Sequence, residues 1–222
     1  MSRSVLWKLA KIAVFLACLA PGIWLIWALF NDGLGADPVD AIRDHTGDWT
    51  LRLLMATLAI TPLRRLTGWS GATRFRRQLG LWAFFYAFAH FFTYLWLDQL
   101  FDWNGIVDDV SKRPWITAGV AAFVLMVPLA FTSTKKWIGR LGGKRWQRLH
   151  QLIYIIAAAG VLHYFLLVKL DATRPLRYAG VLALLLGFRV WNYFRSKRWG
   201  GQNAVPKKTV PSSPISRTDS VH

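Results

Sequence analysis

The most constraining feature of this 222-residue sequence is a series of six long apolar segments. Each approaches the ~20 residues that an α-helix needs to cross a hydrocarbon core of about 30 Å. Because lipid offers the backbone no hydrogen-bond partners, such segments must be helical. We therefore predict an all-α integral membrane protein, built as a bundle of six transmembrane helices. The predicted spans are 9–30, 49–66, 79–97, 115–131, 149–168 and 176–194.

The first span also resembles the start of a secretory signal peptide, since Arg3, Lys8 and Lys11 precede or enter its apolar run. The run continues to Phe30, and no small-residue cleavage site closes it. We therefore favour an uncleaved helix over a signal peptide.

The charged residues orient the chain. A net charge of +17 could indicate a nucleic-acid partner, but the basic residues fall in short clusters between apolar runs and form no single patch. Twenty of the 28 Lys and Arg lie on one side of the predicted membrane, and ten of the 11 acidic residues, all Asp, lie on the other. The positive-inside rule then places both termini of a multi-pass membrane protein in the cytoplasm. We expect membrane lipid and no nucleic acid as a partner.

The chain divides into a membrane domain, 1–194, and a tail, 195–222. The tail is rich in Gly, Pro, Ser and Lys and has no apolar periodicity. A segment of this composition cannot bury enough apolar surface to fold, so we predict a disordered, basic cytoplasmic tail.

Two histidines are predicted to meet inside the membrane. His90 lies in the third span and His163 in the fifth, at similar depths, because odd-numbered spans run in the same direction. Two imidazoles at one depth in an aromatic bundle suit the axial positions of a b-type haem. Hydrogen-bonded histidines or a proton path in a transporter are the alternatives. Transport of a divalent metal is the weaker alternative, because such paths usually use carboxylates and the chain has no Glu and no Asp within a span.

His150 lies at the cytoplasmic mouth of the fifth span, 13 residues before His163. No intramembrane histidine faces it, so a second haem there would need Arg77, Gln78 or water as its other ligand, or an open position. We therefore predict one or two haem b groups.

Arg52 and Arg189 lie inside predicted spans, near opposite faces of the membrane. They either snorkel to the interface or bind the propionates of haem. Two basic clusters, 64–77 and 135–148, either fix the topology and contact anionic lipid or bind a flavin phosphate or an acidic partner.

Several short stretches give the chain a resemblance to a known family. It resembles the MsrQ family, the haem-binding membrane subunits of the bacterial periplasmic methionine sulfoxide reductase system, within the wider ferric-reductase-like transmembrane group. The matching stretches are 33–39 (GLGADPV), 60–63 (ITPL), 76–82 (RRQLGLW), 131–134 (FTST), 144–150 (KRWQRLH) and 163–164 (HY).

This resemblance implies haem ligation by His90, His150 and His163, and an FMN for which Arg77 is one possible phosphate contact. The wider group has two histidines on the third helix where this chain has one, which leaves the number of haems open. The resemblance also implies that the chain carries electrons and has no substrate site of its own. The donor would be a cytoplasmic flavin reductase or quinol, and the acceptor a periplasmic molybdopterin enzyme that repairs methionine sulfoxide in proteins.

Two other functions remain open. One is a stand-alone transmembrane ferric or metal reductase, and the other is a cofactor-free helical transporter or anchor.

Overall fold

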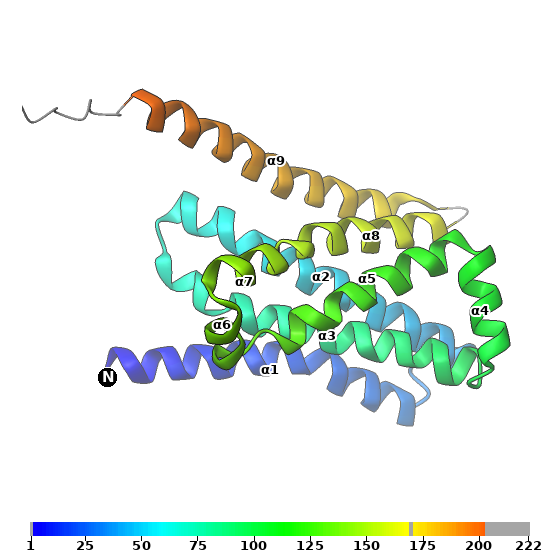
Figure 1. Ribbon diagram of the computed structural model, residues 1–222. Coiled ribbons are helices and arrows are strands. Elements are labelled where there is room, and N and C mark those ends of the chain that lie inside the picture. Colours follow the sequence, from blue (N-terminus) through cyan, green and yellow to red (C-terminus); the bar gives the residue numbers. More distant parts are fainter. Residues whose placement is uncertain (1, 169–170, 203–222) are drawn as a thin grey trace, which may run out of the picture.

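The computed structural model describes residues 2–168 and 171–202, and all secondary structure in these ranges is helical. Figure 1 shows long helices running side by side, with α4 crossing one end of the bundle and α6 and α7 lying toward the other. We call these the α4 end and the α6 end. The helices are α1 Arg3–Phe30, α2 Pro38–Thr67, η1 Ser70–Arg74, α3 Arg76–Thr93, η2 Tyr94–Asp98, α4 Trp103–Lys112, α5 Pro114–Phe131, α6 Lys135–Leu141, α7 Gly143–His150, α8 Leu152–Leu167 and α9 Thr173–Gln202.

Four helical segments are long and apolar enough to cross a membrane, namely Arg3–Phe30, Arg76–Asp98, Pro114–Phe131 and Gly143–Leu167. They correspond to the first, third, fourth and fifth predicted spans. The second and sixth predicted spans lie within α2 and α9, which are helices of sufficient length but carry more charge. Six membrane spans and the orientation of the chain therefore stay predictions.

Local signals explain where several helices begin and end. The α2 helix starts at Pro38, well before residue 49, because Asp37 caps it by accepting a hydrogen bond from the Asp40 N–H at 3.0 Å. It ends at Gly68, whose φ of 71° few other residues tolerate. The α4 helix occupies a segment expected to be a loop, and Asp102 caps it.

The fifth predicted span is divided between α7 and α8, which meet at Gln151. The α9 helix continues to Gln202, beyond the predicted span end at 194. The rest of the predicted tail lies outside the described residues.

The core lies between α2, α3, α5 and α8. Leu54, Leu58, Tyr86 and Ile156 are almost completely buried there. Tyr86 also donates a hydrogen bond from its hydroxyl to the Cys18 carbonyl at 2.8 Å, which ties α1 to α3. Large apolar side chains cover much of the outside, as expected where lipid replaces water.

Candidate cofactor-binding site

His90 and His163 lie next to each other at the α4 end of the bundle. His90 is in the last turn of α3, and His163 lies one turn before the end of α8. Their ring centroids are 6.0 Å apart and the ring planes are close to perpendicular, at 80°. The pair therefore lies nearer the α4 end of both helices than the α6 end.

Each ring is oriented by a backbone carbonyl from a neighbouring helix. His90 donates from Nδ1 to the Arg43 carbonyl of α2 at 3.0 Å, and His163 donates from Nδ1 to the Trp115 carbonyl of α5 at 2.6 Å. A carbonyl can only accept, so the proton lies on Nδ1 and Nε2 keeps its lone pair. Neither Nε2 has a hydrogen bond within the described parts of the chain. Metal-ligating histidines typically have this arrangement.

Two glycines make room for the rings. A Cβ on Gly47 of α2 would lie 3.1 Å from Cε1 of His90, and a Cβ on Gly119 of α5 would lie 2.8 Å from Nδ1 of His163. Real Cβ atoms essentially never show a contact of 2.8 Å, so the His163 ring needs a glycine at position 119, whereas a Cβ at position 47 would force the His90 ring to shift slightly. The sequence analysis identified neither residue.

A cavity of about 490 Å³ surrounds the pair between α2, α3, α5 and α8. Its volume is within the range of sites that bind small molecules and cofactors. The deep wall is apolar and includes Leu54, Phe123 and Ile156. The mouth, at the α4 end, carries charged residues: Arg43, Asp44, Asp48, Asp98, Asp109, Arg113 and Arg174.

The histidine pair fits the axial positions of one haem iron. An iron between the two rings would make two metal–nitrogen bonds of about 2 Å each. With the distance from each nitrogen to the centre of its ring, the ring centres would be about 6 Å apart, as they are in the structure. Within residues 2–168 and 171–202, no three His, Cys, Asp or Glu side chains converge on a possible metal position. A porphyrin supplies four ligands itself and needs only two from the protein.

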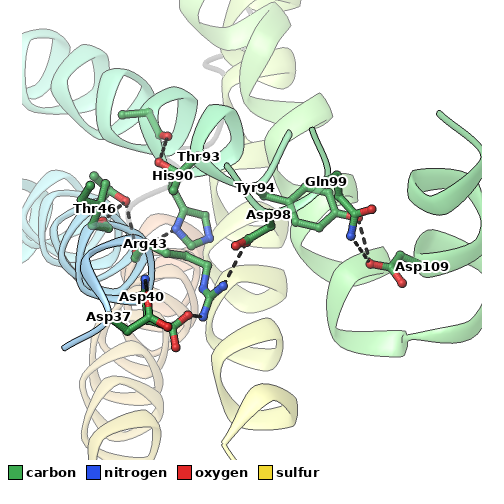
Figure 2. Close-up of polar contacts among 12 residues, drawn as sticks. Asp37, Asp40, Arg43, Thr46, His90, Thr93, Tyr94, Asp98, Gln99 and Asp109 are labelled. Atoms are coloured by element: carbon green, nitrogen blue, oxygen red, sulfur yellow. Dashed lines mark hydrogen bonds and ion pairs between the residues drawn. The ribbon is translucent and has the colours of Figure 1, made fainter. Parts of the chain in front are cut away.

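The mouth is held by paired charges (Figure 2). Arg43 forms ion pairs with Asp98 at 2.9 Å and with Asp40. Asp109 accepts from the Tyr94 hydroxyl at 3.2 Å, from Gln99 Nε2 at 2.9 Å and from Arg113 Nε at 3.1 Å. These contacts join the start of α2 to η2, and η2 to α4. Arg174 has no ion pair with a carboxylate among the described residues.

The arginines predicted to contact propionates lie elsewhere. Arg52 is half exposed, bonded to Asp48 and Tyr178, and does not line the cavity. Arg189 hydrogen-bonds to the Tyr154 hydroxyl and, at 2.8 Å, to Thr61 Oγ1, which ties α9 to α8 and α2. The mouth contains Arg43, Arg113 and Arg174 instead, which the sequence analysis counted only as loop charges.

His150 is at the α6 end, at the junction of α7 and α8. Its ring stacks on Trp146 with centroids 4.0 Å apart, and its Nδ1 donates to the Trp146 carbonyl at 3.1 Å. Its Nε2 is buried and makes no hydrogen bond of ordinary length within the described residues. Arg77 and Gln78, suggested as partner ligands, line a separate groove beside α1.

Comparison with known proteins supports the resemblance seen in the sequence. Residues 46–161 match the family described as "Ferric reductase like transmembrane component". The "Protein-methionine-sulfoxide reductase heme-binding subunit MsrQ" of Xanthomonas campestris pv. campestris (strain 8004) is 50% identical over 208 residues, which cover 91% of this chain and 95% of that protein. The protein of the same name from Rhodospirillum rubrum is 49% identical over 193 residues, which cover 87% and 93%. No solved structure matches. The chain belongs to the MsrQ family, whose membrane domain is of the ferric-reductase-like type.

Proposed function

We propose that this protein is the haem b-binding membrane subunit of a methionine sulfoxide reductase system and transfers electrons across the bacterial inner membrane. The observation that carries this proposal is the His90–His163 pair, with rings 6.0 Å apart beside a cavity of about 490 Å³. The relatives named for heme binding are about 50% identical along nearly the whole chain, which supports the same conclusion.

The residues of the chain have separate roles in this proposal. His90 and His163 bind the iron through Nε2, and the Arg43 and Trp115 carbonyls fix the tautomer and orientation of each ring. The apolar wall excludes water from the iron. Haem supplies one-electron redox chemistry when bound.

The propionates are the charged groups of haem and require cations or water. We propose that they face the cavity mouth, where Arg43 and Arg113 each form ion pairs with one or two carboxylates and Arg174 forms none with the carboxylates of the described residues. Arg52, Arg189 and Arg77 lie outside this cavity, so they are candidates only for a second bound group. His150, with its buried free Nε2, is the proposed ligand of a second haem or a residue close to a flavin.

The predicted topology determines which side of the membrane the haem lies nearest. With six spans and both termini in the cytoplasm, the α4 end is periplasmic, so the haem lies close to a periplasmic acceptor. That acceptor would be a molybdopterin reductase acting on methionine sulfoxide in proteins. The donor would be a cytoplasmic flavin reductase or membrane quinol, and FMN is the second proposed cofactor.

The optical spectrum of the purified full chain tests the haem proposal. We expect a Soret band and reduced b-type bands, which His90→Ala and His163→Ala abolish. His45→Ala is the matched control, because His45 is also at the α4 end but stacks on Trp24 and contacts the Pro21 carbonyl. Unchanged bands in both site variants would refute the ligand assignment.

Reoxidation of the reduced haem tests the acceptor. We expect methionine sulfoxide to reoxidise the haem only when the periplasmic reductase is present. Equal reoxidation without the partner, together with rapid reoxidation by ferric ion, would favour a stand-alone metal reductase.

A further inference from the structure

A second hollow, at the α6 end, lies on the outside of the bundle between α1 and α3. We call it the α1–α3 groove, and its volume is about 410 Å³. Three cations, Lys11, Arg74 and Arg77, line it together with Gln78, and no acidic side chain does. Within the described ranges none of these cations forms an ion pair. The groove is therefore a concentration of uncompensated positive charge.

The lining of the groove changes from cationic to apolar along the helix axes. On α1, Lys11 is followed four residues later by Phe15, and on α3, Arg77 is followed by Leu81 and Phe85 at the same spacing. Residues four apart lie on one helix face, one turn above the other. Arg74 and Arg77 thus lie around the start of α3 and Lys11 lies about two turns into α1, whereas the aromatic and aliphatic side chains lie one to two turns deeper along each helix.

The groove is held open by contacts between the two helices. Gln78 donates from Nε2 to the Lys11 carbonyl at 2.9 Å, which fixes the relative depth of α1 and α3. Deeper, the rings of Phe15 and Trp82 pack edge to face with centroids 5.1 Å apart. Arg74 is positioned by stacking over the Trp7 ring at 4.3 Å. The shape therefore does not depend on a ligand.

The apolar part of the groove faces away from the bundle. Phe15 is 47% exposed and Phe85 51% exposed, on two helices that are apolar enough to cross a membrane. A phospholipid can place its acyl chains along these rings while its headgroup reaches the cations, whereas a water-soluble phosphate compound would contact the cations alone. Clusters of cations at the ends of membrane helices are suited to phosphate headgroups.

From this arrangement we propose that the α1–α3 groove is a binding site for one anionic phospholipid. The phosphate of the headgroup contacts Lys11, Arg74 and Arg77, and the acyl chains lie along Phe15, Leu81 and Phe85. A free phosphate or the phosphate of FMN shares the headgroup chemistry, so the experiment has to separate these sources. This site does not depend on haem.

Native mass spectrometry of the detergent-purified full chain provides the test. Phosphatidylglycerol and phosphatidylcholine with identical acyl chains are titrated separately. We expect phosphatidylglycerol to bind more tightly, and Arg74→Gln with Arg77→Gln to weaken it by roughly fivefold per charge. The matched control is Arg64→Gln with Arg65→Gln, which removes two cations from the same end but outside the groove. We expect this control to leave binding unchanged.

Three results would overturn the proposal. These are equal binding of the two lipids, an equal loss in the control variant, and displacement of phosphatidylglycerol by FMN or inorganic phosphate at comparable concentration. The last would assign the cations to a soluble phosphate ligand. If the groove variant does not fold, a salt titration of the unaltered chain decides. The preference for phosphatidylglycerol must fall as ionic strength rises, and a preference that does not change contradicts the proposal.

Discussion

The two ends of the bundle use similar residues in opposite ways. At the α4 end, Arg43 and Arg113 are paired with carboxylates, and two histidines share one cavity with Nδ1 bonded across helices. At the α6 end, Lys11, Arg74 and Arg77 have no acidic neighbour in their groove, and His150 stacks on Trp146 of its own helix and donates to its carbonyl. Charges that are paired can hold a rigid cofactor site inside a protein, whereas charges that are unpaired are available to a ligand from outside.

The largest predicted difference between the two ends comes from adding a methyl group next to one histidine of the pair. Gly119→Ala places a Cβ against the His163 ring, so the ring must leave the position in which it bonds to the Trp115 carbonyl. Overpacking of this kind costs about 1–3 kcal/mol, which lowers haem affinity by about fivefold to a hundredfold. Gly139→Ala is the control at the α6 end, because nothing lies within 4 Å of its Cβ. Haem per protein after purification and haem titration measure the effect. Equal haem content in the two variants would refute the role of Gly119.

The sequence predicted the histidine pair at the α4 end, but it did not predict the residues that support the pair. Apolar length and equal depth were enough to bring His90 and His163 together, because the depth of a residue along a helix follows from its number. The supporting residues depend on how helices pack, so Gly47 and Gly119 have no signal of their own in a single sequence. Arg43 is an intermediate case. The pair Asp37 and Pro38 is a standard helix start, and recognising it would have placed Arg43 on α2 instead of in a loop.

The next largest effect is expected when one arginine is replaced at each end of the bundle, because only one of the two should change the reduction potential of the haem. Arg174→Gln removes a cation at the cavity mouth, which favours the oxidised haem and lowers its reduction potential. A change of about 1 kcal/mol corresponds to a few tens of millivolts for one electron. Arg189→Gln removes contacts to Tyr154 and Thr61, so it should lower the thermal unfolding midpoint and leave the potential unchanged. Redox titration measures the potential of both variants. A larger shift in Arg189→Gln would instead place the propionates at the α6 end.

A smaller effect is expected from the ion pairs at the α4 end. Arg43→Gln breaks the pair with Asp98 and loosens the start of α2 from η2, where the side chains are 30% and 22% exposed. Partly exposed pairs contribute up to about 1 kcal/mol. The matched variant is Lys112→Gln, whose pair with Asp108 is largely exposed, and we expect almost no change there. Thermal unfolding measures both, and the electron paramagnetic resonance spectrum reports whether His90 has turned. Equal destabilisation would mean that the Arg43 pair has no special role.

The smallest predicted effect concerns Asp44, a carboxyl at the cavity mouth whose negative charge is only partly balanced by the neighbouring positive charge. Burial raises the pKa of Asp44 above its ordinary value of 3.8, and the nearby charge of Arg43 offsets this only in part. A carboxyl with a raised pKa in the folded protein is harder to ionise there than in the unfolded chain, so its charge lowers stability at neutral pH. That cost disappears as the pH falls below the pKa of the carboxyl in the unfolded chain.

Asp44→Asn should therefore raise the unfolding midpoint slightly at pH 7, and this increase should become smaller at acidic pH. Asp32→Asn, in the exposed connection between α1 and α2, is the control for the removal of one acidic side chain. If Asp44→Asn raises the unfolding midpoint equally at acidic and neutral pH, ionisation of Asp44 does not destabilise the folded protein. The negative charge of Asp44 would then be fully balanced by the cations at the cavity mouth.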